Sequence, residues 1–180
     1  GPEITGSKEW APKNYDDKYE GWMRVREALA HSKNLPAIRI LHDITPQYAQ
    51  QWITRFGFDP KRHPPYLTMV LGAGETSPWA LARAYAVFAN GGYLVEPYLI
   101  DEIRDGQGTL LWKAHPTVAG DERIRAIPAR NAWLIDSMLH TVVERGTGAA
   151  ARRALKRNDL AGKTGTTNDA VDAWFAGYHP

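Results

Sequence analysis

The order of the local patterns along this chain restricts its fold more than any single motif does. Patterns typical of helices come first, and short β-prone runs that suit antiparallel pairing close the chain. A doubly wound sheet would need strands and helices to alternate along the sequence. We therefore predict an α+β fold, in which an antiparallel sheet is packed with helices.

Helix-start and helix-stop signals locate the helices of the first half. Thr45-Pro46 and Ser77-Pro78 each combine an N-cap residue with a proline at the first helical position. The first of these helices is expected to stop at Gly57 and the second at Asn90-Gly91. Before them, helical spacing covers residues 22–31, and Pro36 is expected to open a helix through residue 44, with the letters "HSKN" as the break between the two.

The later part is predicted to hold a hairpin, a long helix and two neighbouring strands. Asp105-Gly106 reads as a hairpin turn between "YLVEPYLIDEI" and "GTLLW". A helix is expected over 128–144, ending at Gly146, and a short one in "AAARRALKR". "DLAGKTGTTN" and "VDAWFAGYH" are expected to pair through a turn at Asn168-Asp169. The chain divides into a loop or short strands (1–21), a helical part (22–92) and a part with strands and a helix (93–180).

Charge and composition exclude several classes of function. Among 180 residues, 22 are basic and 20 acidic, for a net charge of +2, and no run of like charge suggests nucleic acid as a partner. The absence of cysteine removes thiolate metal sites, and the six histidines show no paired metal-ligand spacing. No metal and no cofactor are therefore expected, and no apolar run is long enough to span a bilayer. A small or peptidic ligand fits this composition best.

The letters "GKTGTT" near the end are the strongest candidate for a binding site. A phosphate loop needs a glycine five positions before Gly162, and Arg157 stands there, so that interpretation fails. An exposed strand or a turn rich in threonine remains the plain alternative. On a strand, Lys163 and Thr166 would lie on opposite faces, so one ligand could reach both only along the strand's edge. There Gly165 would let another backbone approach, and the lysine and hydroxyl groups would suit a carboxylate.

Two separated motifs, taken together, resemble a known family. "KTG" at residues 163–165 and "SKN" at residues 32–34 match two of the three signatures of penicillin-binding proteins and serine β-lactamases. Helix capping at a break would explain "SKN" if it stood alone. The segments "VREALAHSKNLPAIRIL", "LGAGETSPWALARAYAVFANGGYLVEPYLI" and "LAGKTGTTNDAVDAWFAGYHP" also resemble the transpeptidase domain of class A, bifunctional penicillin-binding proteins of the 1A type. This resemblance covers nearly the whole chain.

The resemblance implies a fold, an activity and a set of site residues. It implies part of one transpeptidase domain of the penicillin-binding protein and serine β-lactamase fold, which cross-links D-Ala-D-Ala stem peptides of peptidoglycan through a serine acyl-enzyme and binds β-lactams. Ser32 would relay protons, Asn34 would bond the substrate's amide, and Lys163 would orient Ser32 and keep the cleft positive. Thr164, Thr166 and Thr167 would hold the terminal carboxylate, with the N–H of Thr166 as one oxyanion-hole donor, and Gly165 would leave room for the substrate.

The family's nucleophile motif is not found in these residues. No serine here has a lysine three positions later, and Lys33 is adjacent to Ser32, where side chains do not face one another. We expect the nucleophile segment before residue 1 and a further strand and helix after residue 180, so that the fragment alone is inactive. The resemblance also implies a glycosyltransferase domain in the full-length protein and a location on the periplasmic side of the inner membrane, to which that protein is tethered.

Two alternatives remain from the sequence. A D,D-carboxypeptidase or a β-lactamase would share the motifs, because the difference is whether water or an amine attacks the acyl-enzyme. A non-catalytic cell-wall-binding module would explain the seven tryptophans and eight tyrosines. Core-like positions of Trp52, Phe56, Tyr85, Phe88 and Trp133 favour packing over sugar stacking.

Overall fold

The computed structural model describes residues 10–167 and 172–179. Its helices and strands confirm the α+β prediction, with antiparallel pairing in both sheets that the described residues form. The α-helices are α2 (Val25–Ala30), α3 (Asn34–Ile44), α4 (Pro46–Trp52), α5 (Pro78–Ala89), α6 (Ala129–Arg145) and α7 (Ala149–Leu155). The strands are β1 (Glu102–Arg104), β2 (Leu110–Lys113), β3 (Ala161–Thr166) and β4 (Ala173–Tyr178). Short 3-10 turns, η1 (Ile53–Phe56), η2 (Pro60–Arg62), η3 (Leu67–Leu71) and η4 (Glu122–Ile124), connect them.

The predicted helix caps are confirmed. The Thr45 hydroxyl accepts a hydrogen bond from the N–H of Tyr48 at 3.3 Å, and that of Ser77 accepts one from the N–H of Ala80 at 3.2 Å. After α4, the turn η1 continues the helical path until Gly57, whose φ of 81° is left-handed. The helix-capping residues therefore predicted these helix ends correctly, because capping depends on contacts within a few residues.

Helix bounds before residue 45 differ from the prediction. Helix α3 begins at Asn34 and not at Pro36, which lies in its first turn, where the missing N–H needs no partner. Helix α2 is shorter than residues 22–31, and Trp22 is fully exposed. Residues 10–21 form loop without strands.

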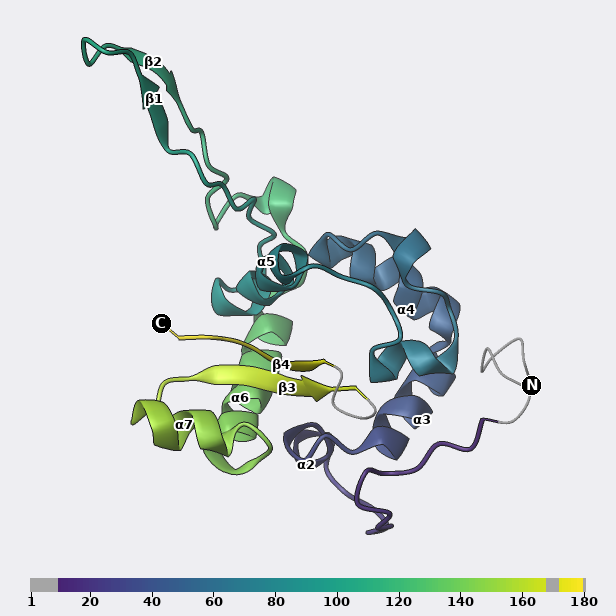
Figure 1. The fold of residues 1–180 in the computed structure, drawn as a ribbon. Coiled ribbons are helices and arrows are strands. Elements are labelled where there is room, and N and C mark those ends of the chain that lie inside the picture. Colours follow the sequence, from purple (N-terminus) through teal and green to yellow (C-terminus); the bar gives the residue numbers. More distant parts are fainter. Residues whose placement is uncertain (1–9, 168–171, 180) are drawn as a thin grey trace.

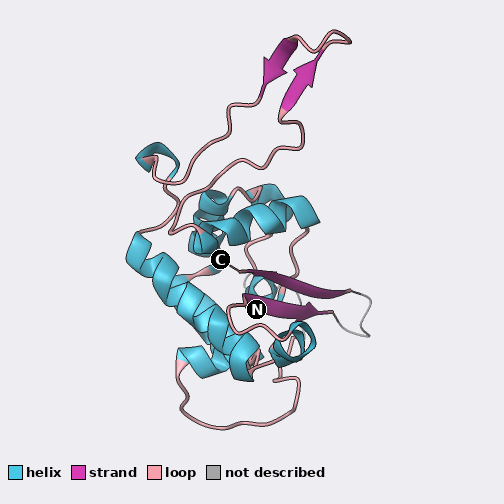
Figure 2. Cartoon of the chain, turned by 90° about the vertical axis from the view of Figure 1, so that its left-hand side faces the viewer, coloured by secondary structure: helices cyan, strands magenta, loops and turns pink. Residues whose placement is uncertain are grey.

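Helix α6 is the structural centre of the part that carries the site. It crosses behind the β3–β4 ribbon and contacts α2, α5 and α7, while α5 also lies against β4 (Figures 1 and 2). Its inward residues Leu139, Val142 and Val143 are buried. The hydroxyl of Tyr178 on β4 donates to the carboxylate of Asp136 on α6 at 2.8 Å, and burial raises the pKa of Tyr178.

Strands β3 and β4 form the predicted antiparallel pair. Gly162 faces Gly177 across the ribbon, and the ring of Phe175 fills the space that side chains at both positions would need. The predicted turn at Asn168-Asp169 lies outside the described residues. Thr167 and Asp172 stand before and after it in the sequence. The N–H of Thr167 donates to the Asp172 carbonyl, and the N–H of Asp172 donates to the Thr167 hydroxyl, so the two residues close this end of the ribbon.

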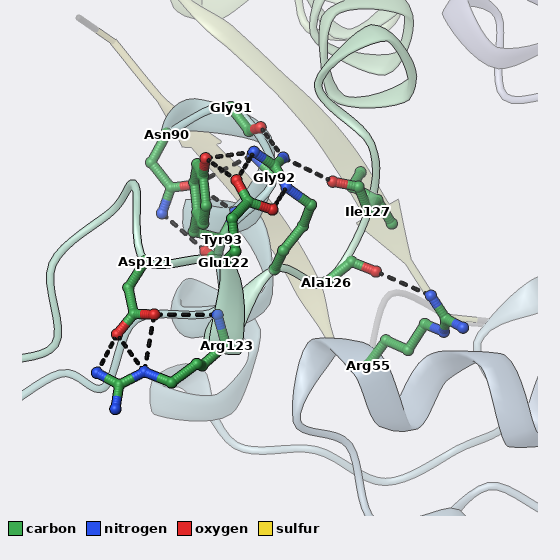
Figure 3. Close-up of polar contacts among 11 residues, drawn as sticks. Arg55, Asn90, Gly91, Gly92, Tyr93, Asp121, Glu122, Arg123, Ala126 and Ile127 are labelled. Carbon is green, nitrogen blue, oxygen red and sulfur yellow. Dashed lines mark hydrogen bonds and ion pairs between the residues drawn. The ribbon is translucent and has the colours of Figure 1, made fainter.

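The β1–β2 hairpin was predicted at the right place, and it extends away from the helices (Figure 1). A network around Tyr93, Glu122 and Ile127 lies at its base (Figure 3). Arg125 joins these three residues, donating to both carboxylate oxygens of Glu122 and to the carbonyl of Ile127. The guanidinium also bonds the Tyr93 hydroxyl and stacks over its ring.

Two apolar clusters pack between the helices and the adjoining segments. One contains the buried residues Val87, Ala126, Ile127 and Ala132, and the other contains Ile38, Leu41 and Leu67. Trp52, Phe56 and Phe88 pack against the first cluster, as predicted from their positions. The prediction was wrong for Trp133, which is 66% exposed, because it lies on the outer face of α6.

The end of α6 approaches α2 very closely. A Cβ placed on Gly146 would lie 2.1 Å from the carbonyl oxygen of Ala30, and the N–H of Thr147 donates to that same oxygen at 3.0 Å. Ala30 is the last residue of α2 and stands two positions before Ser32. The glycine therefore lets the two helices meet directly beside the candidate site.

Gly146→Ala is expected to lower the free energy of unfolding by about 1–3 kcal/mol, because the added methyl group has backbone on two sides and must push the helices apart. Urea unfolding followed by circular dichroism measures this change. Gly106→Ala in the hairpin turn is the matched control, since a Cβ there meets nothing within 4 Å. Equal stability of the two variants would contradict the role assigned to Gly146.

Candidate active site

Ser32 and Lys163, which are 131 positions apart, meet in the structure. The ammonium group of Lys163 donates a hydrogen bond to the Ser32 hydroxyl oxygen at 2.9 Å, and another to the carbonyl of Thr164 at 2.8 Å. Ser32 is exposed and Lys163 is half-buried. The two motifs that the sequence analysis paired therefore form one polar site.

The break between α2 and α3 presents the serine. The N–H of Ser32 donates to Leu29 and the N–H of Lys33 to Ala28, which ends α2 in a tight turn. Ser32 has a φ of 53°, in the left-handed region that serine seldom occupies. This conformation turns the chain so that the serine stands between the helices, opposite the strand that carries Lys163.

The second side of the site is strand β3. Lys163 faces Ala176 of β4 across the ribbon, and β3 lies against α6 on one side of that ribbon. Within the described residues β3 pairs with β4 alone, so its other edge has no strand partner. That edge is where an extended peptide could bond the backbone.

Burial lowers the pKa of Lys163. Desolvation disfavours the ammonium form, and no carboxylate forms an ion pair with this residue among residues 10–167 and 172–179. The site thus holds a cation whose charge is not neutralised there. Such a cation favours an anionic ligand group.

The threonines of the motif have different surroundings. The Thr164 and Thr147 hydroxyl oxygens are 2.6 Å apart, while Thr166 is exposed near the end of β3. A Cβ on Gly165 would meet no atom within 4 Å, so space is open there. The Thr167 hydroxyl accepts a hydrogen bond from the N–H of Asp172 at 2.8 Å and so helps to close the ribbon.

Asn34 lies near Ser32 in sequence, but its side chain bonds elsewhere. Its amide nitrogen donates to the carbonyl of Lys13 at 2.8 Å, which links α3 to the N-terminal loop. The structure thus brings Ser32 and Lys163 into contact and leaves Asn34 beside them as the first residue of α3.

Thr147 contacts the candidate site, and the sequence analysis did not identify it. It follows Gly146 in the loop between α6 and α7 and reaches Thr164 on β3. The only local signal was the Gly-Thr-Gly sequence after the helix stop, which is equally typical of an ordinary helix end. Its place in the site follows from the close contact between α6 and α2.

Other features of the described residues offer no competing site. A concavity of about 470 Å³ between the end of α6 and α7 is lined by Glu144, Arg152 and Lys156, among others, and by none of the predicted site residues. In residues 10–167 and 172–179 there is no group of three or more potential metal ligands. The helices in the same part of the chain are too short or too polar to cross a membrane.

The fold and this site define a class of protein. The family model "Penicillin binding protein transpeptidase domain" matches residues 2–180, and the chain therefore belongs to this family. Within it, the chain is similar to penicillin-binding proteins 1A. The protein of that name from Neisseria lactamica is 52% identical over 171 residues, which are 95% of this chain and 21% of that protein. The one from Neisseria flavescens is 51% identical, with 98% of this chain and 22% of that protein aligned.

A solved structure agrees with this assignment. The crystal structure of penicillin-binding protein 1A from Haemophilus influenzae matches with a TM-score of 0.89 and 36% identity, over 96% of this chain and 31% of that one. The resemblance to the 1A type and the transpeptidase fold are thereby confirmed. The chain spans about a fifth of the length of the curated relatives named above.

The Lys163 ammonium is expected to lose its proton at a lower pH than an ordinary lysine, because burial penalises its charged form. An NMR titration of the lysine side chains measures this pKa, and the signal is assigned by its absence in Lys163→Arg. Since the unfolded chain then binds more protons between the two pKa values, stability should rise with pH across that window. A Lys163 pKa at or above 10.5, the ordinary value, would contradict the assigned environment.

Proposed function

We propose that this chain is part of the transpeptidase domain of a peptidoglycan D,D-transpeptidase that binds stem peptides ending in D-Ala-D-Ala and β-lactams that mimic them. The observation that carries this proposal is the hydrogen bond from Lys163 on β3 to Ser32, on a strand whose second edge has no strand partner in the described part of the chain. This hydrogen bond brings together Ser32, which could transfer a proton, and the Lys163 cation, on a strand whose edge could bind a peptide. Membership of the transpeptidase family supports the same conclusion.

Ser32 is suited to carry a proton during acyl transfer. Because Lys163 donates to the Ser32 oxygen, the hydroxyl hydrogen of the serine is free to point at another acceptor. In the proposed reaction that acceptor is the nitrogen of the departing D-alanine or, in a β-lactam, of the opened ring. General acid–base catalysis of this kind contributes typically about 10²–10⁴-fold in rate.

Strand β3 is suited to bind the substrate's terminal carboxylate. The proposal assigns this to Lys163, Thr164 and Thr166, with Thr147 holding the Thr164 hydroxyl. A charge-assisted hydrogen bond there would contribute about 1.5–3 kcal/mol. The main-chain N–H of Thr166 would supply one of the two oxyanion-hole donors, and the loss of one such donor typically costs about 2.7–4 kcal/mol.

Asn34 and Thr167 take secondary parts in this proposal. The Asn34 amide nitrogen bonds Lys13, which leaves its carbonyl oxygen as the group for the substrate's amide N–H. Thr167 acts by closing the β3–β4 ribbon through Asp172, and through that closure it supports the carboxylate site. The space beside Gly165 admits the substrate backbone.

The proposal places the nucleophilic serine in a segment of the full-length protein outside these 180 residues. No serine of this chain has a lysine at the third following position, and the Lys33 side chain is bonded to Asp16 and Glu20. The whole protein would also carry a glycosyltransferase domain and a membrane tether, and the domain described here would act on the periplasmic side of the inner membrane. A strand and a helix after residue 180 would complete the domain.

Fluorescent penicillin is expected to label the full-length protein covalently, at a serine outside this chain that mass spectrometry can locate. Ser32→Ala should slow the labelling about 10²–10⁴-fold, because the proton relay is lost. Ser137→Ala on α6 is the matched control, since the carbonyl of Ser137 that bonds Arg26 and Thr141 is unchanged by the substitution. The isolated 180-residue chain should form no adduct.

Several outcomes would overturn the proposal. They are a full-length protein that penicillin does not label, or an adduct on Ser32 itself. Incubation with stem pentapeptides separates the related activities, because a transpeptidase gives cross-linked dimers and a hydrolase gives only the shortened peptide. Binding to glycan strands that lack stem peptides would indicate a cell-wall-binding module instead.

A further inference from the structure

The loop before α2 is fastened to the helix break that carries Ser32. Asn14 is buried, and its side-chain oxygen accepts from the N–H of Leu35 at 3.1 Å while its amide donates to the carbonyl of Lys18 at 2.7 Å. The Asn34 side chain returns a hydrogen bond to Lys13. Hydrogen bonds between side chains and main chain therefore attach the loop to the first turn of α3.

Lys33 is the strongest of these attachments. Its side chain is only 7% exposed, and its ammonium group contacts Asp16 at 2.6 Å and Glu20 at 3.0 Å. These hydrogen bonds raise the pKa of Lys33 and lower that of Asp16, so both stay ionised at neutral pH. Lys33, the middle residue of the Ser-x-Asn motif, is thus a cation held by ion pairs to two residues of the loop.

The neighbouring serine needs such an anchor. A left-handed φ at a non-glycine residue is disfavoured, and it persists where the surrounding structure determines it. On its N-terminal side Ser32 is held by the end of α2, and on its C-terminal side it is joined directly to Lys33. In this arrangement the Ser32 hydroxyl oxygen is 2.9 Å from the Lys163 ammonium nitrogen.

We propose that Lys33, clamped by Asp16 and Glu20, is a positioning residue that sets the Ser32 hydroxyl against Lys163. The inference rests on the proposed function, because the value of this placement is proton transfer at Ser32. The Lys33 ammonium bonds Asp16 and Glu20, whereas the Ser32 oxygen is bonded by Lys163. Lys33 acts through the backbone that it shares with Ser32, and the two carboxylates act through Lys33.

The test uses the full-length protein and compares Asp16→Asn/Glu20→Gln with the control Asp17→Asn. The double variant keeps the shapes of both side chains and removes both charges that face Lys33. Asp17 stands next to Asp16, and within residues 10–167 and 172–179 its carboxylate pairs only with exposed Lys13. Asparagine tolerates the left-handed φ of 51° at this position. Acylation by fluorescent penicillin is measured well below the unfolding temperature and normalised to titrated active sites.

The double variant is expected to acylate about 10- to 100-fold more slowly per active site, the size of loss that a small misplacement of a catalytic group produces. The Asp17→Asn protein should match the parent. The single variant Asp16→Glu, which keeps a carboxylate at this position, should acylate at most of the parent's rate. Glu20→Gln alone is a milder variant that serves if the double variant does not fold.

A second readout separates positioning from mere stability. Displacement of Ser32 exposes Lys163 to water, so the pKa of Lys163 in the double variant should rise toward its ordinary value. A lower melting temperature with an unchanged rate per active site and an unchanged Lys163 pKa would overturn the positioning role. A parent that forms no adduct would overturn the proposed function, and the Lys163 titration would then decide the placement of Ser32 by itself.

Discussion

The packing of α6 against β3 on one side and α2 on the other determines where the two halves of the site lie. Gly146 at the end of α6 leaves room for the Ala30 carbonyl, which brings the end of α2 and the loop at Thr147 together. Strand β3 lies along the same helix, and Tyr178 ties its partner β4 to Asp136. Ser32 follows α2 and Lys163 lies on β3, and both of these elements pack against the same helix, α6.

The two lysines at the site use their charges in opposite ways. The Lys33 side chain is buried and forms ion pairs with Asp16 and Glu20, so its charge is engaged within the protein. Lys163 has no carboxylate partner in the described part of the chain, and its charge is therefore available to a ligand. Burying an unpaired cation costs desolvation free energy, and perturbed ionisable groups of this kind cluster at functional sites.

Much of the fold could be predicted because its signals are local. The caps at Thr45 and Ser77, the stop at Gly57 and the hairpin at Asp105-Gly106 each depend on residues within a few positions. The predictions were wrong where contacts between residues far apart in the sequence determine a helix boundary or the burial of a side chain. At the start of α3, Leu35 donates a hydrogen bond to Asn14 and Asn34 donates one to Lys13. The exposure of Trp133 depends on which face of α6 the sheet covers.

The sequence by itself determined which residue types the candidate site contains and to which family the chain belongs. The motifs "SKN" and "KTGTT" can be recognised from the order of residues alone. Only the tertiary structure decided that the Lys163 ammonium lies 2.9 Å from the Ser32 oxygen, that Thr147 reaches Thr164, and that Lys33 bonds Asp16 and Glu20. The physical reason is range. Capping and turn preferences act over a few residues, whereas these contacts join segments up to 131 positions apart, which chain packing alone brings together.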